Sequence, residues 1–74
     1  MKEYESLINA VVNMSPNIDM GRLEDRCFIA GKLHGMIDLY NIETIAKATV
    51  ELEIPLYMKQ WGLDFLNNSN NKNK

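Results

Sequence analysis

The chain has 74 residues, of which 46% are hydrophobic, and it carries a formal net charge of −2. This length predicts a single domain, and the apolar content is too high for a disordered chain. The single cysteine, Cys27, excludes an internal disulfide and favours a reducing compartment. The first residues lack a signal-peptide pattern, and no apolar run approaches the ~18 residues of a membrane helix. We therefore expect a cytoplasmic protein with no membrane association.

The charge is distributed unevenly, because residues 1–66 contain six Lys and Arg residues against ten Asp and Glu residues. Proteins that bind nucleic acids usually present a basic surface, since contacts with phosphates supply much of their affinity. An acidic body therefore favours a protein partner over a nucleic acid. The chain is also rich in large apolar side chains for its length, which predicts a homodimer or a bound partner that covers the surplus.

The first predicted helix covers residues 3–14, where Tyr4, Leu7, Ile8 and Val11 recur at helical spacing. Acidic residues fall in its first turn, where the helix dipole favours them. Residues 15–17, read Ser-Pro-Asn, predict a turn that ends this helix, because a proline removes a backbone donor.

The second predicted helix is long and central, covering about residues 19–40 with Asp19 as its cap. Its apolar residues span about half of its circumference, so it should contact neighbours on two sides. Gly31 and Gly35 lie four residues apart near Cys27 and form a stripe of small residues. Such a groove predicts close packing, either of the first or last helix or of a second copy of the same helix; a kink is the remaining reading.

The third predicted helix begins at Ile42 after a cap at Asn41 and continues to about Glu53. Residues 50–54, Val-Glu-Leu-Glu-Ile, alternate between apolar and polar types. Strict alternation is also typical of a strand, so a strand that pairs across a dimer is the alternative for this segment.

The fourth predicted helix covers residues 55–67 and opens with Pro55, which suits a first helical position. One of its faces carries the predicted partner-binding residues Tyr57, Met58, Trp61 and Phe65. Aromatic anchors dominate protein interfaces, although the same side chains could instead pack on the central helix as core. Residues 67–74 are polar and of low complexity, which predicts a disordered tail behind a single helical domain of residues 1–66.

The sequence offers few groups for catalysis or metal binding. His34 is the only histidine, and it lies seven residues after Cys27 on the apolar side of the central helix. The pair lacks the further ligands that a zinc site needs, and only two copies across a dimer axis could supply them. No phosphate-binding loop or nucleophile motif is present. We expect no enzyme activity, no cofactor and no metal.

The resulting prediction is an all-α bundle of three to four helices that forms a dimer. We expect it to act as a non-enzymatic regulator or inhibitor by binding another protein. The Asn- and Lys-rich tail is typical of AT-rich bacteria, phages or mobile elements. Two alternatives are open. Residues 42–66 can be read as a helix–turn–helix that binds DNA, although Lys59 and Gln60 are the only donors on its second helix. The chain could also be a structural subunit of a larger assembly.

Overall fold

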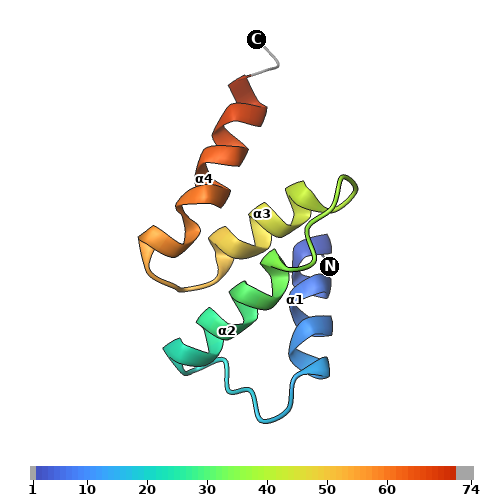
Figure 1. The fold of residues 1–74 in the computed structure, drawn as a ribbon, viewed down its shortest axis with the longest axis vertical. Coiled ribbons are helices and arrows are strands. Elements are labelled where there is room, and N and C mark those ends of the chain that lie inside the picture. The colour runs from blue at the N-terminus through green and yellow to red at the C-terminus, as the bar shows by residue number, and fades with distance from the viewer. Residues whose placement is uncertain (1, 72–74) are drawn as a thin grey trace.

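The structure, a computed structural model, describes residues 2–71 and consists of four helices (Figure 1). No strand occurs within this range, so the all-α prediction is confirmed. The helices are α1 (Glu3–Met14), α2 (Leu23–His34), α3 (Ile42–Glu51) and α4 (Leu56–Asn71). The bounds of α1 agree with the apolar spacing of residues 3–14, and α3 begins at the expected residue.

The core lies where α1, α2 and α3 meet. Ile29 and Leu33 of α2, with Ile45 of α3, are fully buried, and Val11 of α1 is almost so. These positions follow the helical spacing of apolar residues, which places one face of each helix toward the others. The complete buried cluster consists of Val11, Ile29, Ala30, Leu33, Ile45, Ala48, Leu52 and Ile54.

Helix α4 is attached to this body chiefly through α3. A glycine, Gly62, lies at their contact, where an added Cβ would be only 2.9 Å from the carbonyl oxygen of Ala46 and 3.1 Å from a methyl group of Val50. In contrast, no Cα atom of α1 or α2 lies within 8 Å of a Cα atom of α4 in the described residues. The C-terminal part of α4 therefore projects from the body, as Figure 1 shows.

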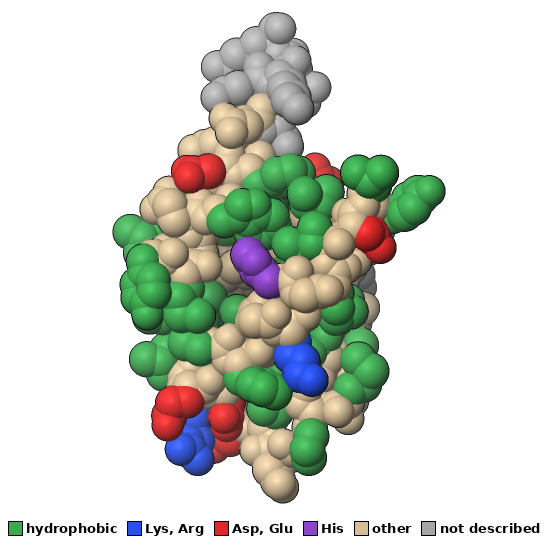
Figure 2. Space-filling model, viewed as in Figure 1, with side chains coloured by type: hydrophobic (Ala, Val, Ile, Leu, Met, Phe, Trp, Pro, Cys, Tyr) green, Lys and Arg blue, Asp and Glu red, His purple; other side chains and the backbone are tan. Residues whose placement is uncertain are grey.

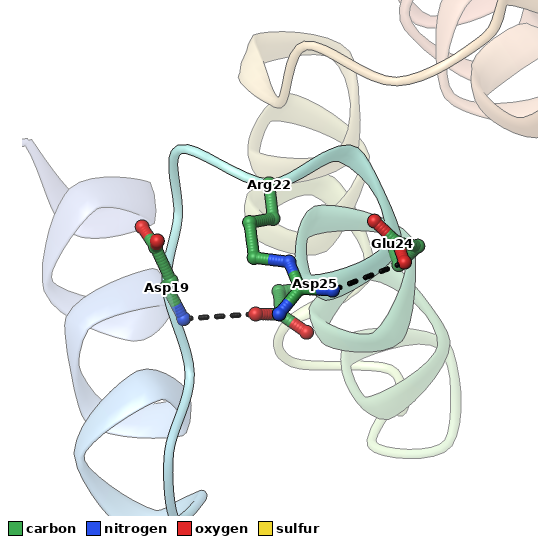
Figure 3. A network of polar contacts seen from close by, with 4 residues as sticks. All are labelled: Asp19, Arg22, Glu24 and Asp25. Atoms are coloured by element: carbon green, nitrogen blue, oxygen red, sulfur yellow. Dashed lines mark hydrogen bonds and ion pairs between the residues drawn. The ribbon is translucent and has the colours of Figure 1, made fainter.

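Helix α2 begins four residues later than predicted, at Leu23. Asp19 does not cap the helix; its Oδ1 accepts the N–H of Gly21 at 2.9 Å and forms a turn before α2. The N–H of Asp19 is donated to Oδ2 of Asp25 at 3.0 Å, so a carboxylate in the first turn of α2 holds the incoming chain (Figure 3). Arg22 and Glu24 beside it form an exposed ion pair of 3.3 Å.

Helix α2 also ends earlier than predicted, at His34. The carboxylate of Asp38 accepts the N–H groups of Tyr40 at 2.8 Å and Asn41 at 3.0 Å, which favours a turn over a continuing helix. Asn41 occupies the N-cap position of α3, as predicted, but its side chain makes no capping hydrogen bond and donates its amide to the carbonyl oxygen of Met36. The predicted long central helix over 19–40 is therefore too long at both ends, because local side-chain bonds stabilise turns there.

Arg26 connects two loops to α2. Its Nε donates to the carbonyl oxygen of Glu53 at 2.7 Å, and one terminal nitrogen donates to the carbonyl oxygen of Met20 at 2.8 Å. Glu53 lies in the α3–α4 connection and Met20 in the α1–α2 connection. A single guanidinium thus supplies donors to two segments that have no helical partner for these carbonyls.

The strand alternative for residues 50–54 is wrong. Val50 and Glu51 end α3, and residues 52–55 form the connection to α4. The alternation instead reflects Leu52 and Ile54, which lie in the connection and are both buried, while Glu51 and Glu53 are exposed. Helix α4 begins directly after Pro55 and runs to Asn71, beyond the expected end at 67. The rest of the predicted tail, residues 72–74, lies outside the described residues.

Candidate functional site

The candidate site is an apolar groove between α2 and α4. The two helices are bridged by His34 and Trp61, whose rings meet edge to face with centroids 4.8 Å apart. Trp61 in turn stacks on Phe65 at 5.9 Å. Because the backbones of α2 and α4 stay apart, side chains alone close the space between them. A hollow remains beside this bridge.

The hollow has a volume of about 260 Å³ and is lined by Ala30, Gly31, His34 and Met58. We call it the α2–α4 groove. Its lining is mostly apolar, and a Cβ added at Gly31 would meet no atom within 4 Å. The missing side chain of Gly31 therefore leaves open space at the surface of α2. In Figure 2 hydrophobic side chains gather around the histidine on this face, over α4 and its N-terminal end.

The four predicted partner-binding residues occupy different positions on α4. Met58 lines the groove, and both Met58 and Trp61 also pack against the core. Phe65 is half-buried against Trp61. Tyr57 is 82% exposed. The predicted face therefore combines core and surface residues: Trp61 packs against the core, and Tyr57 is exposed to solvent.

The predicted small-residue stripe of Cys27, Gly31 and Gly35 does not receive another helix of this chain. Gly31 is open, and Gly35 forms the C-cap of α2, where a Cβ would meet only the carbonyls of its own last turn. Cys27 is half-buried against the core. The glycine that allows close packing is Gly62, which the sequence analysis did not single out. Contact between two copies through the stripe stays a prediction.

Gly31 and Met58 come from the two separately predicted sets, yet both line the same groove. The structure thus joins the small-residue stripe of α2 to the aromatic face of α4. Sequence reasoning could not join them, because the packing of α4 on α3 determines which α4 residues face α2.

Sequence reasoning also missed the exposed residues Leu39 and Tyr40, which were assigned to the central helix. They lie in the α2–α3 loop and are 91% and 97% exposed. The signal that could have found them is Asp38 followed by Asn41, since both residue types favour turns and helix starts over helix interiors.

A second hollow of about 470 Å³ lies between the N-terminal end of α1 and α3. Its charged lining residues are Lys2, Glu3, Glu43 and Lys47, two of each sign. Lys47 and Glu43 form an exposed ion pair of 3.8 Å, and the carboxylate of Glu3 accepts the Thr44 hydroxyl at 3.3 Å. These solvated groups neutralise one another, so the hollow offers no concentration of charge to a ligand.

Among residues 2–71 no three His, Cys, Asp or Glu side chains come together in an arrangement that could hold a metal ion. Every buried side-chain nitrogen and oxygen described has a hydrogen-bond partner, so none is held in reserve for a ligand. The buried polar residues are Ser15, directly after α1, and Thr49 of α3, and they donate to the carbonyl oxygens of Val11 and Ile45 four residues earlier.

Across residues 2–71, no helix combines the length and the apolar character that crossing a bilayer requires. Comparison of the chain with protein-family models, with curated proteins and with solved structures gave no match.

Proposed function

We propose that this chain is a small non-enzymatic protein that regulates or inhibits another protein by binding it through the α2–α4 groove. The observation that carries the proposal is the open, apolar groove beside Gly31, on a small domain that leaves several large apolar side chains in solvent. Contiguous exposed apolar surface on a small domain is typical of interaction sites. The expected setting is the cytoplasm, where Cys27 stays reduced.

The groove favours an apolar anchor from its partner. Elsewhere on the same two helices Phe28 and Tyr57 are both exposed, and the Nζ of Lys32 lies 5.3 Å from the centre of the Phe28 ring. An apolar side chain that entered beside Gly31 would contact Met58 and the exposed edge of His34. A buried apolar anchor is the usual centre of an interface hot spot.

The DNA-binding alternative has support from shape alone. Helices α3 and α4 are joined by the short connection 52–55 and pack closely, as in a helix–turn–helix. The charges of this helix pair do not suit DNA, because residues 42–68 contain two lysines and four carboxylates. Gln60, one of the two predicted donors to DNA, already donates to Asp64 at 3.0 Å. The charged residues are Glu43, Lys47, Glu51, Glu53, Lys59 and Asp64.

Affinity capture from a native lysate with surface variants tests the proposal. Gly31→Arg places a long side chain at a position where a Cβ meets no atom within 4 Å, and Tyr57→Ser removes an exposed ring. We expect both to lose a protein that the parent retains after nuclease treatment. Met14→Ser is the matched control, since Met14 is 70% exposed at the end of α1, outside the groove, and it should retain that protein.

Two outcomes would contradict the proposal. Capture that disappears after nuclease treatment, and that Lys59→Glu abolishes while Gly31→Arg does not, would favour DNA binding. Purified chain that assembles into large particles without a second protein would favour a structural subunit.

A further inference from the structure

The α2–α3 loop presents two adjacent apolar side chains, Leu39 and Tyr40, that touch little of their own chain. They are the most exposed of the large hydrophobic residues. Single apolar residues on a surface are ordinary, but a leucine beside a tyrosine, both almost wholly in water, form a continuous projection. We call these two residues the loop tip.

The loop that carries the tip is held by its own hydrogen bonds. Asp38 accepts from the backbone of Tyr40 and Asn41, and it donates its own N–H to the side-chain oxygen of Asn41 at 2.7 Å. Asn41 also donates to the carbonyl oxygen of Met36 at 2.8 Å. A projection fixed in this way loses little conformational freedom on binding, which favours association.

The loop that carries the tip projects at the edge of the face on which the groove histidine lies. In Figure 1 the α2–α3 loop extends from the body at the upper right, and Figure 2 shows hydrophobic side chains at that place, at the outline of the side where the histidine is visible. A projection at the edge of a face and a hollow on that face allow a closed pair, since a twofold axis makes each contact twice.

We propose that the occupant of the groove is the loop tip of a second copy, so that the chain forms a symmetric dimer with two identical contacts. Leu39 and Tyr40 of each copy insert beside Gly31 of the other, against Met58 and His34. This inference rests on the groove that the proposed function uses, and it adds a regulation: self-association covers the surface that a different protein must reach.

The charges at the two surfaces are complementary. Asp38, directly before the tip, is the one charged residue in the segment 35–42. Lys32 flanks the groove, next to Gly31, and has no carboxylate partner in the described residues, where its Nζ lies over the Phe28 ring. The reciprocal arrangement twice brings the Asp38 carboxylate toward the Lys32 ammonium, neither of which has an ion-pair partner in the described residues, and this favours the pairing over like-charged alternatives.

Sedimentation of the purified full chain over a concentration series tests the dimer. We expect the parent to form dimers. The double variant Leu39→Ser, Tyr40→Ser should raise the dissociation constant of the dimer by about 100-fold or more, since two anchors are lost at each contact. Gly31→Leu should raise the dissociation constant to a similar extent, because its side chain fills the groove. Both variants should retain the parent's helical circular dichroism, and Met14→Ser should dimerise as the parent does.

A mixture of the two variants gives the sharpest result. The tip variant retains an open groove, and the groove variant retains an intact tip, so the mixture can form one of the two contacts. We expect heterodimers in the mixture at concentrations where each variant alone is monomeric. Lys32→Glu should also weaken the dimer, by placing a carboxylate opposite Asp38.

Several results would overturn the inference. They are a parent that stays monomeric at every concentration, tip variants that dimerise as well as the parent, a mixture with no heterodimer, and open-ended oligomers in place of a closed pair. A monomeric parent that still captures a protein through Gly31 and Tyr57 would overturn the dimer alone. A dimer that captures nothing through those residues would overturn the proposed function alone.

Discussion

Gly62 of α4 lies against Ala46 of α3 so closely that a Cβ at Gly62 would be 2.9 Å from the Ala46 carbonyl oxygen. The neighbouring atom belongs to helical backbone, which cannot move aside cheaply. This contact sets the distance between α3 and α4, and α3 is the only helix whose backbone approaches α4 in the described residues. The position of the α2–α4 groove therefore depends on a glycine that does not line it.

Gly62→Ala should destabilise the protein although alanine favours helix. The overpacking cost of about 1–3 kcal/mol is expected to exceed the helix-propensity gain of about 1 kcal/mol. Gly31→Ala is the matched control, because it gains the same propensity in open space and should raise the free energy of unfolding. Urea denaturation measures both. If the two variants shifted stability in the same direction, the close packing at Gly62 would be refuted.

Leu33 and Leu39 are six residues apart and should respond oppositely to truncation. Leu33 is fully buried in the core, so Leu33→Ala should cost about 2–5 kcal/mol, enough to unfold much of so small a domain. Leu39→Ala should change the free energy of unfolding by less than about 0.5 kcal/mol, since its side chain is in solvent. Thermal denaturation monitored by circular dichroism, at concentrations where the chain is monomeric, distinguishes the two.

Arg26→Gln should destabilise the protein by about 1–2 kcal/mol, since hydrogen bonds from charged donors are lost in a partly solvated setting. The carbonyl oxygens of Glu53 and Met20 lose their guanidinium donor together. Arg22→Gln is the matched control, because its ion pair with Glu24 is exposed on both sides and contributes little. Equal denaturation midpoints for the two variants would show that the Arg26 contacts are not stabilising.

His34→Ala should expose an edge of Trp61 and cost about 1 kcal/mol, the usual size of an aromatic pair contribution. Trp61 is the only tryptophan of the chain, so its fluorescence emission reports this site and should shift to longer wavelength. His34→Phe keeps a ring against the Trp61 edge and should leave the emission close to that of the parent. An unchanged emission in His34→Ala would mean that the edge contact does not shield the indole.

The sequence predicted helix type and number well, because apolar spacing reports which face of a segment is buried. Residues 3–14 are the clearest case. The ends of α2 were predicted less well, since Asp19 and Asp38 act through turns that compete with helix only once their backbone partners are in place. The alternation of Leu52 and Ile54 is produced by a buried connection, which periodicity alone cannot distinguish from a strand.

The candidate site was predicted in parts. Met58 and Trp61 stand at helical spacing, which indicates a shared face, and Gly31 indicates missing volume. Whether that volume is filled by the same chain depends on the approach of α3 to α4 at Gly62, a contact between distant segments. Leu39 and Tyr40 are exposed because α2 ends before them. The predicted helix included both residues, so their exposure in a loop was not predicted.

The bonds of Arg26 also determine which parts of the molecule can open separately. Its guanidinium holds the connection before α2 and the connection before α4, although about thirty residues of chain separate these two segments. A fluctuation that releases the first turn of α2 must free both, so their amides should exchange with solvent deuterium as one cooperative unit. Local unfolding at one end of α2 is thereby coupled to the base of α4, the helix that forms the far wall of the groove.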